Sequence, residues 1–334
     1  MRIGLSYDLK ETVRIRQDLP EDALEEYDSV ETLETIAAAL KALGHTTVWL
    51  GGGKEFLTNI LQERVDVVFN IAEGRGDFRS REAQVPCVLE MLDMPYTGSD
   101  PQCLAICLDK PLAKKLAAAE GVSTPRWLVI TDIEQLQRTT WNGFPFPTVV
   151  KPSHEGSSKG IRIGNRVEHI RQAVDLVVEL LDRYRQPVIV EEFIAGDEVT
   201  VGVLGNSPPK VLGIMRVLPK IRRENFIYSL EVKRDWERLV EYECPAQLDG
   251  ITAQRIMDAS LKIFTVLGCR DFARIDFRVS AEGVPYFLEI NPLPGLNTSS
   301  DLPIMACKMG LDFQGLISEI LGAALERYPQ CVAK

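Results

Sequence analysis

The sequence predicts an α/β unit followed by α+β units, and three observations lead to this fold class. The chain has 334 residues, of which 45% are hydrophobic, and this is enough for the cores of two or three domains. Strand-like and helix-like segments alternate over the first hundred residues, which predicts a parallel sheet with helical crossovers. Near the C-terminus, two segments alternate apolar and polar residues with the period of a half-buried strand.

The first unit, residues 1–100, is expected to be the α/β part. Its expected elements are a strand, a helix closed by Gly44, two further strands, a second helix and a short strand: Arg2–Tyr7, Val30–Leu43, Thr46–Leu50, Val65–Ile71, Arg81–Leu92 and Met94–Gly98. Ligands of such sheets bind beyond the carboxyl ends of the strands. We therefore expect this unit to contribute to a substrate site.

Two further units are expected after residue 100, over residues 101–190 and 191–334. The first should contain two helices and four strands: Leu104–Glu120, Val167–Arg185, Arg126–Ile130, Thr148–Lys151, Gly160–Gly164 and Val188–Glu192. The second should contain further strands, a mobile segment near 219–245, two helices and the alternating hairpin. Its two helices are expected at Thr252–Leu267 and Phe313–Tyr328.

Composition excludes several classes of protein. The net charge of −10 and the pI of about 5.1 argue against general nucleic-acid binding, which needs clustered basic surface. Seven cysteines without a CxxC pair indicate reduced thiols, and we interpret Cys103 and Cys107 as apolar fillers rather than zinc ligands. The chain shows neither the apolar core of a signal peptide nor a membrane span. We therefore expect a cytoplasmic protein without a membrane partner.

The alternating hairpin near the C-terminus suggests a metal site. It comprises Ala273–Phe277 and Tyr286–Gly295, joined through a turn at residues 281–283. If the strands pair, three oxygen donors converge, the hard ligands that Mg²⁺ takes when it also binds phosphates: Asp276, Glu289 and Asn291. Arg274 beside them could neutralise an oxyanion, and Gly295 could expose a backbone N–H to a ligand. The alternative is an ordinary amphipathic hairpin whose charges face water.

A second pattern, between two expected strands, is typical of a loop that covers phosphates. Lys151 places a cation at the end of one strand, and a segment rich in glycine and serine follows it up to Gly160. Ser157 and Ser158 supply hydroxyl and N–H donors, while glycine lets the backbone approach a ligand. The alternative is a flexible surface turn, because glycine and serine are common in turns generally.

A third pattern, Val188–Glu198, is consistent with a pocket for adenosine. An apolar strand runs into the carboxylate pair Glu191 and Glu192, and a turn follows. Phe193 and Ile194 could pack on the face of a base, and Glu198 could accept hydrogen bonds from ribose hydroxyls. The alternative is that Phe193 belongs to the core and the glutamates are solvated.

From about Asp66 to the C-terminus, the chain resembles the D-alanine–D-alanine ligase family of ATP-grasp enzymes. Six motifs carry the resemblance, in the family's order: Pro95–Ser99, Leu108–Lys110, Val150–Pro152, Glu155–Gly160, Tyr242–Ala246 and Asn291–Gly295. The resemblance implies an N-terminal parallel-sheet domain followed by a two-subdomain ATP-grasp fold, with ATP between the subdomains. It also implies a homodimer.

The resemblance also implies roles for individual residues. Those near ATP would be Lys110, Lys151, Glu191, Glu192, Phe193, Ile194, Glu198 and Leu288. Two Mg²⁺ ions, or Mn²⁺, would be held by Asp276, Glu289 and Asn291. The lid serines Ser157 and Ser158, the loop lysine Lys233, Arg274 and the Gly295 N–H would act on the reacting groups, and Ser300 would hold the carboxylate of the second substrate.

The chain departs from the family pattern at three positions. Glu25 is the candidate for the carboxylate that receives the first substrate's ammonium, although residues 21–28 could equally be a solvated acidic run. Glu73 replaces a histidine, and we expect it to pair with Arg75, Arg79 or a substrate ammonium. Arg234 replaces a tyrosine that helps to determine whether an amine or a hydroxyl attacks.

The resemblance therefore implies an ATP-dependent ligase that joins a carboxylate to an amine through an acyl phosphate, releasing ADP and phosphate. D-Alanine is the expected substrate at both positions, and D-alanyl-D-alanine is a peptidoglycan precursor of the cell wall. One alternative is a related ligase for another amino-acid or hydroxy-acid pair. Another is a nucleotide-binding sensor without turnover, although such a sensor would not need Arg274 as an oxyanion donor.

Overall fold

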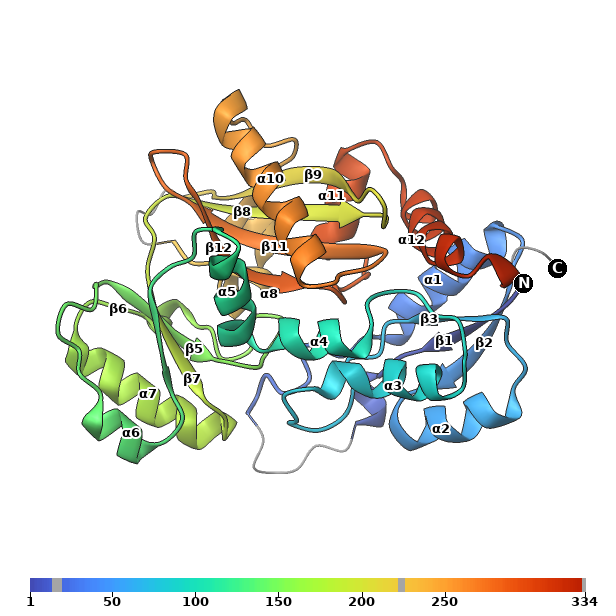
Figure 1. Ribbon diagram of the computed structural model, residues 1–334, viewed down its shortest axis with the longest axis horizontal. Coiled ribbons are helices and arrows are strands. Elements are labelled where there is room, and N and C mark those ends of the chain that lie inside the picture. The colour runs from blue at the N-terminus through green and yellow to red at the C-terminus, as the bar shows by residue number, and fades with distance from the viewer. Residues whose placement is uncertain (14–19, 222–225, 332–334) are drawn as a thin grey trace.

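The computed structural model describes residues 1–13, 20–221 and 226–331, and this part of the chain contains three sheets (Figure 1). The first is a parallel sheet with the order β2-β1-β3. The second is antiparallel, with the order β4-β7-β5-β6, and the third is antiparallel, with the order β10-β9-β8-β11-β12. The predicted combination of α/β and α+β architecture is confirmed.

The N-terminal unit is a sheet buried between two helical layers. Its strands are β1 (Arg2–Ser6), β2 (Thr46–Gly51) and β3 (Val67–Asn70). One face packs against α1 (Val30–Ala42) and α12 (Phe313–Arg327), and the other against α2 (Gly53–Gln62) and α3 (Gln84–Met91). In β3, Val67 and Phe69 face the first layer and Val68 faces the second, so every residue of this strand is buried.

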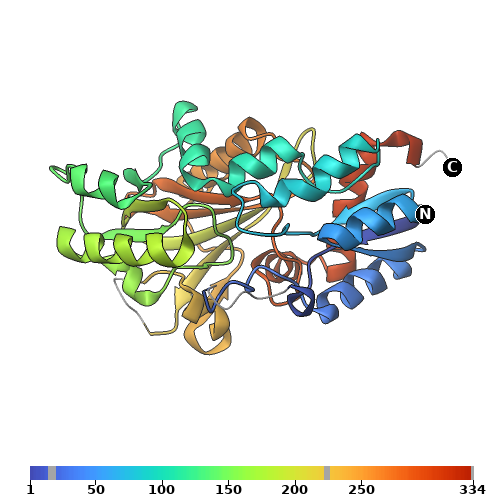
Figure 2. The ribbon, with the colours of Figure 1, turned by 90° about the horizontal axis from the view of Figure 1, so that it is seen from below.

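The central unit holds the four-stranded sheet. Its elements are β4 (Trp127–Ile130), α6 (Ile133–Arg138), β5 (Thr148–Pro152), β6 (Arg166–Val167), α7 (Ile170–Tyr184) and β7 (Val188–Glu192). Helices α6 and α7 cover one face of this sheet through a compact apolar cluster. Figures 1 and 2 both show these helices on the outer side, which leaves the opposite face turned toward the third sheet.

The C-terminal unit holds the five-stranded sheet. Its strands are β8 (Asp197–Leu204), β9 (Lys210–Pro219), β10 (Val240–Glu243), β11 (Phe272–Val279) and β12 (Pro285–Asn291). Its helices are α8 (Leu230–Arg234), α9 (Trp236–Leu239), α10 (Gly250–Val266) and α11 (Asp301–Lys308). One face of the sheet packs against α10, α4 (Pro101–Leu108) and α5 (Lys110–Ala119), so the polar residues of β11 and β12 lie on the other face.

The last helix of the chain returns to the first unit. Leu316, Ile317 and Ile320 of α12 are completely buried and share a core with α1 and β3. Figures 1 and 2 accordingly show the N-terminus and the end of α12 at the outer edge of the N-terminal sheet. None of the described helices is long and apolar enough to cross a membrane.

Two expected elements are wrong in detail. The predicted helix Leu104–Glu120 is broken at Asp109, because Pro111 has no N–H to continue the ladder and Asp109 instead caps α5 through the N–H of Leu112 at 3.1 Å. The predicted strand Gly160–Gly164 is a turn followed by a 3₁₀-helix at Ile163–Asn165. Asn165 closes this turn by donating to the carbonyls of Val150 and Gly160, each at 2.6 Å.

Two further differences concern segments that the sequence pattern did not resolve. Helix α2, over Gly53–Gln62, was not expected. Within the segment 219–245, for which mobility was expected, the described residues form α8, α9 and β10, and residues 222–225 lie outside the described part.

One buried carboxylate connects the N-terminal and C-terminal units. The Asp271 carboxylate accepts hydrogen bonds from Arg327 Nε at 3.0 Å and Nη2 at 2.6 Å, from the N–H of Gly98 at 2.7 Å and from Asn206 Nδ2 at 3.0 Å. Arg327 Nη2 also donates to the carbonyl of Tyr96 at 2.9 Å. These bonds join the end of the first unit to β11 and α12.

Replacement of Asp271 by alanine is expected to lower the thermal unfolding midpoint by about 5 °C or more, because it leaves a partly buried guanidinium and a buried N–H without their acceptor. Differential scanning calorimetry would measure the change. The exposed Asp175→Ala change on α7 is the matched control and should shift the midpoint by less than about 2 °C. Equal midpoints for Asp271→Ala and Asp175→Ala would show that the hydrogen bonds of the Asp271 carboxylate contribute nothing to stability.

Candidate active site

A narrow pocket lies between the four-stranded and five-stranded sheets. Its volume is about 80 Å³. Its walls come from β5, β7, β8, β11, β12 and α8, and the lining includes Lys151, Ser158, Glu191, Glu192, Phe193, Ile194, Glu198, Lys233, Asp276, Leu288 and Glu289. The structure thus brings together residues that lie more than a hundred positions apart in the sequence. We call this space the inter-sheet pocket.

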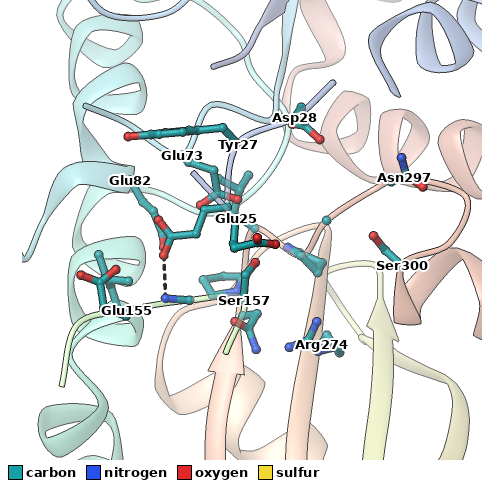
Figure 3. Close-up of a pocket in the computed structure, with 18 of the residues that line it drawn as sticks. Glu25, Tyr27, Asp28, Glu73, Glu82, Glu155, Ser157, Arg274, Asn297 and Ser300 are labelled. Carbon is teal, nitrogen blue, oxygen red and sulfur yellow. Dashed lines mark hydrogen bonds between the residues drawn. The ribbon is translucent and has the colours of Figure 1, made fainter. Parts of the chain in front are cut away.

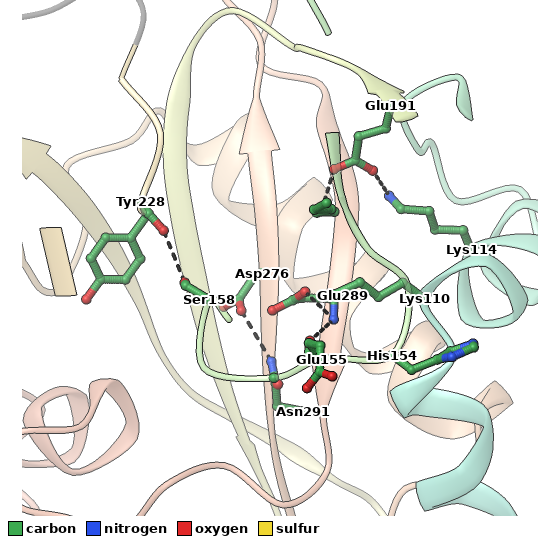
Figure 4. Close-up of polar contacts among 12 residues, drawn as sticks. Lys110, Lys114, His154, Glu155, Ser158, Glu191, Tyr228, Asp276, Glu289 and Asn291 are labelled. Carbon is green, nitrogen blue, oxygen red and sulfur yellow. Dashed lines mark hydrogen bonds and ion pairs between the residues drawn. The ribbon is translucent and has the colours of Figure 1, made fainter. Parts of the chain in front are cut away.

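A buried ion triad forms one wall of the inter-sheet pocket. Glu191 of β7 lies 2.5 Å from Lys151 Nζ of β5 and 2.9 Å from Lys114 Nζ of α5 (Figure 4). Lys114 also donates to the carbonyl of Phe287 at 2.9 Å. Burial lowers the pKa of Lys114 to about 8, although Glu191 opposes this shift. The alternative of solvated glutamates is therefore wrong for Glu191.

Phe193 lies between two guanidinium groups rather than in an apolar core. Arg166 and Arg278 each lie 4.7 Å from the centroid of its ring. Arg278 also donates to the carbonyls of Ile194 at 2.9 Å and Gly196 at 2.8 Å, and it lies 2.7 Å from Glu198. These bonds fix the turn after β7. Burial raises the pKa of Glu198, and Arg278 opposes that shift.

The hairpin β11–β12 brings the three expected metal ligands together. Asp276 pairs in register with Glu289, and Arg274 pairs with Asn291. Asp276 Oδ2 lies 2.8 Å from Arg274 Nη2 and 3.3 Å from Asn291 Nδ2 (Figure 4). Thr200 of β8 donates its hydroxyl hydrogen to the same carboxylate. The alternative in which these charges simply face water is not what the structure shows, because Asp276 and Glu289 line the inter-sheet pocket and Asp276 is in contact with Arg274.

Glu289 is surrounded by cations. Lys110 Nζ lies 3.3 Å from its carboxylate. Burial alone would raise the pKa of Glu289, but the charges of Lys110 and Lys151 hold it well below the usual range of a carboxyl group. The donor set of two carboxylates and one amide offers hard oxygen ligands, so these residues fit a Mg²⁺ or Mn²⁺ ion.

A second, larger space opens between the N-terminal unit and the five-stranded sheet. This central cavity has a volume of about 290 Å³. Its walls include Lys10, residues 25–29, Glu73, Glu82, Lys110, residues 155–157, Arg274, residues 289–295, Asn297, Ser299 and Ser300. Figure 3 shows the acidic residues on one side of this cavity, with Arg274 and Ser300 on the opposite side. Glu289 lines both the central cavity and the inter-sheet pocket, so the two spaces meet there.

Arg274 is held firmly at this junction. Its Nη2 lies 2.8 Å from Asp276, and its Nη1 lies 3.4 Å from Asp301 at the start of α11. Gly295 and Ser300 are close neighbours, because a Cβ at Gly295 would lie 3.0 Å from Ser300 Oγ. A side chain at position 295 would therefore crowd the cavity beside Arg274.

The glycine- and serine-rich loop lies against the α8 segment. Ser157 and Ser158 both adopt positive φ, and Ser158 Oγ donates to the carbonyl of Tyr228 at 3.2 Å (Figure 4). The N–H of Leu230 donates to the carbonyl of Ile161 at 3.0 Å. Lys233 Nζ lies 5.1 Å from the ring centroid of Tyr228. Burial lowers the pKa of Lys233, and the charge of Arg274 lowers it further.

The acidic run at residues 21–28 is largely buried, contrary to the alternative of a solvated surface. Glu26 lies 2.6 Å from Arg81 Nη2 and 3.0 Å from Lys159 Nζ, and it accepts the N–H of Gly156 at 2.6 Å. Glu155 lies 2.5 Å from Lys159 and 3.3 Å from Arg81. This cluster ties the loop to the N-terminal unit.

Asp22 makes a second connection between the same run and the central unit. It accepts hydrogen bonds from Tyr184 Oη at 2.9 Å and from the N–H of Gly160 at 3.0 Å. Asp22 and Glu26 were both missed as individual residues. The mixture of acids and apolar positions in residues 20–28 was the available signal, because it differs from a uniformly solvated face.

Two of the three departures from the family pattern lie in contact with each other. Arg234 Nε donates to Glu25 Oε1 at 3.1 Å, so the Glu25 carboxylate already has a cation partner. The expected pairing of Glu73 with Arg75 is wrong, because Arg75 Nε pairs with Asp8 at 2.5 Å instead. Over the described part of the chain, no hydrogen bond or ion pair reaches the Glu73 carboxylate, from Arg79 or from any other residue.

The buried ion triad of Glu191, Lys114 and Lys151 predicts that the stability of the protein depends on pH. A lysine with a folded-state pKa near 8 and an ordinary value of 10.5 binds its proton less tightly when folded, so the free energy of unfolding rises with pH between these values. In Glu191→Gln, the buried ammonium groups of Lys114 and Lys151 lose their anionic partner. The free energy of unfolding should therefore begin to rise at a lower pH than in the wild type. We expect the variant's thermal midpoint to lie about 5 °C or more below the wild type at pH 7, with a smaller difference at pH 9.

The matched control is Glu179→Gln on the exposed face of α7, for which the midpoint difference should be small at both pH values. Thermal scans monitored by circular dichroism at pH 7 and pH 9 would test this. A difference for Glu191→Gln that stays constant over this range would contradict the predicted lysine titration.

One family model and several known proteins match this chain. The model described as the C-terminus of D-ala D-ala ligase matches residues 116–322. A D-alanine–D-alanine ligase from Aquifex aeolicus is 36% identical over 293 residues, which cover 88% of this chain and 94% of that protein.

Two solved structures share the fold. A D-alanine–D-alanine ligase from Bacillus anthracis complexed with ATP has a TM-score of 0.75 at 24% identity and is covered over 99% of both chains. The VanG D-Ala:D-Ser ligase from Enterococcus faecalis has a TM-score of 0.71 at 22% identity, covering 97% of this chain and 99% of that one. These structures show the shared fold, and the family model and the Aquifex relative show that the chain belongs to the D-alanine–D-alanine ligase family of ATP-grasp enzymes.

Proposed function

We propose that the protein joins the carboxylate of one amino acid to the amine of another and uses ATP to activate the carboxylate. The observation that carries this proposal is the junction at Glu289, a residue that lines both the inter-sheet pocket and the central cavity. Lys110 and Arg274 lie at this junction. A phosphoryl group arriving from one space could therefore meet a carboxylate held in the other.

The nucleotide would occupy the inter-sheet pocket. Its base would lie near Phe193, Ile194, Glu192 and Leu288, with the ribose near Glu198, because these residues line the end of the pocket next to the turn after β7. Its phosphates would lie toward Lys110 and Lys151, under the loop that carries Ser157 and Ser158. Glu191 keeps Lys151 in place through their ion pair, so the cation is positioned before the nucleotide arrives.

The reaction needs two steps. Transfer of the γ-phosphoryl group from ATP to a substrate carboxylate oxygen gives an acyl phosphate and ADP. The lone pair of the second substrate's neutral amine then attacks the acyl carbon and a C–N bond forms. The C–O bond breaks, phosphate leaves with its electrons, and the nitrogen gives up one proton to the departing phosphate. Arg274 and the Gly295 N–H would stabilise the oxyanion of the tetrahedral intermediate, and Lys233 would approach the transferring phosphoryl group.

A metal ion would be held by Asp276, Glu289 and Asn291. When bound, a divalent ion neutralises charge on the nucleotide phosphates. The protein's own contribution is to keep both carboxylates ionised and oriented: Thr200 and Arg274 fix Asp276, and nearby lysines keep Glu289 deprotonated.

D-Alanine is the first candidate for both substrates, with the α-carboxylate of the second held by Ser300. This product would make the enzyme a supplier of a peptidoglycan precursor. A second candidate is a ligase for a different amino-acid or hydroxy-acid pair. Two observations favour it. Arg234 pairs with the Glu25 carboxylate, and Glu73, which stands where the family pattern has a histidine, lines the cavity and forms no ion pair with any described residue.

Incubation with Mg-ATP and D-alanine is expected to release ADP in amounts that match the dipeptide formed. A coupled ADP assay and mass spectrometry of the products would measure both. ADP release that requires an added amino acid would exclude a nucleotide sensor. ATP binding without ADP release, over a broad panel of amino and hydroxy acids, would contradict the ligase proposal.

Replacement of Arg274 by methionine is expected to lower kcat by about 10²–10³ with little change in the KM for ATP, because the lost donor acts on the oxyanion. Steady-state kinetics with the substrate pair found above would measure this effect. Arg171→Met, on the exposed face of α7 and away from both cavities, is the matched control. A kcat for Arg274→Met within about threefold of the control would remove Arg274 from the mechanism.

A further inference from the structure

The N-terminal wall of the central cavity carries more carboxylates than cations. Glu25 and Glu26 both have cationic partners, in Arg234 and in Arg81 with Lys159. Three other acids on this wall form no ion pair with any cation in the described part of the chain: Asp28, Glu73 and Glu82. They come from separate segments of the first unit, so the concentration of charge arises only in the folded chain.

Of these three acids, Glu82 is the one whose burial and contacts bear most directly on a ligand. It lies on the 3₁₀-helix Arg81–Ala83, is only 8% exposed and lines the cavity. Within the described ranges, it receives no hydrogen bond and no ion pair. Arg81, its neighbour in the sequence, is directed elsewhere: it lies 2.6 Å from Glu26 and donates to the carbonyl of His154 at 2.8 Å. Burial raises the pKa of Glu82 to about 7, which is what a carboxylate without a full partner would show.

Glu73 lies close enough to the other acids to feel their charge. Burial, followed by the charges of Glu82, Glu26 and Asp28, raises the pKa of Glu73 well above its ordinary value. Figure 3 shows Glu73, Glu82 and Asp28 grouped on the side of the cavity opposite Arg274. Lys10 is the cation on this wall that acts on Asp28, where it partly opposes the effect of burial.

This charge balance constrains the substrate. Among the described residues, no ion pair reaches Glu73 or Glu82, although the charges of Arg81 and Lys110 oppose the rise in the pKa of Glu82. An amino acid whose carboxylate lies at Arg274 would contribute one α-ammonium, which can pair most directly with one of these two carboxyl groups. A negative charge left in a closed site is costly, whereas a charge-assisted hydrogen bond to a substrate cation is among the stronger polar contacts.

We propose that one of the two amino acids joined by this enzyme carries a second cationic group, as a diamino acid does, and that Glu73 and Glu82 receive it. This inference rests on the proposed ligase function. It favours the second candidate, a ligase for a different substrate pair, because the side chain of alanine has no cationic group to pair with Glu73 or Glu82. The competing explanation is that Glu73 and Glu82 share a proton and form a neutral pair, in which case a neutral side chain would be preferred.

The test compares diamino acids with neutral amino acids of matched length. The pairs are 2,3-diaminopropionate with 2-aminobutyrate, 2,4-diaminobutyrate with norvaline, and ornithine with norleucine, in both enantiomers, each alone and with D-alanine added. ADP release with Mg-ATP gives kcat/KM, and mass spectrometry identifies the amide. At least one diamino acid is expected to exceed its neutral partner by about tenfold or more. Neutral partners that react equally well or better would overturn the inference and leave the ligase function intact.

Two variants test whether the preference for a diamino acid depends on Glu73 and Glu82, which lie on the N-terminal wall of the central cavity. In Glu82→Gln and Glu73→Gln, the ratio of kcat/KM between a diamino acid and its neutral partner is expected to fall at least about fivefold. Glu34→Gln, on the exposed face of α1, removes the same charge outside the cavity and should keep the ratio. A ratio unchanged in both cavity variants would overturn the assignment of these two residues.

A binding measurement separates failure of the inference from failure of the proposed function. Isothermal titration calorimetry of the wild-type protein with the same amino-acid pairs, in the presence of a non-hydrolysable ATP analogue, does not depend on turnover. If no amino acid supports ADP release, the ligase function is overturned. Tighter binding of the diamino acid would then still support the acidic subsite, and equal or weaker binding would overturn it.

Discussion

The buried ion cluster of Glu26, Arg81, Glu155 and Lys159 is the interaction on which both cavities depend. It joins the loop at residues 153–160 to the N-terminal unit, although the loop belongs to the four-stranded sheet. Burial would raise the pKa of Glu26, but Arg81 and Lys159 lower it to about 2, so the carboxylate stays ionised. Because the loss of one member would leave a buried charge uncompensated, the cluster holds the loop in place as a unit.

By joining the loop to the N-terminal unit, this ion cluster also determines how positive and negative charges are distributed around the site. Four cations act on Glu289: Lys151 and Lys233 line the inter-sheet pocket, and Lys110 and Arg274 line the central cavity. The acidic wall supplied by the N-terminal unit lies on the side of the central cavity opposite Arg274 (Figure 3). In the proposed reaction, an amino acid would have the matching polarity, with its carboxylate directed toward Arg274 and its ammonium toward the acids. The same separation would keep the anionic nucleotide in the other space, so that the two ligands would meet only at the junction.

Much of the catalytic core could be predicted from the sequence because its residues are tied to local patterns. A period of two fixes which residues of β11 and β12 share a face, and the turn at residues 281–283 fixes their pairing, so Asp276 and Glu289 lie opposite each other as expected. Local patterns also caused the errors. The helical periodicity over 104–120 concealed the break that Pro111 imposes, and the glycines around residue 160 belong to a turn instead of a strand.

The sequence by itself determined the fold class, the polar face of the hairpin and the order of the segments that we propose contact the nucleotide, since these follow from periodicity and from motifs within a few residues. Only the tertiary structure decided the partners of the charged groups. Glu25 pairs with Arg234 across 209 positions and Lys114 contacts Phe287 across 173, whereas none of the described residues forms an ion pair with Glu82, although Arg81 is its neighbour. The reason is physical: which buried charge is neutralised depends on the packing of distant segments, and no local pattern specifies that packing.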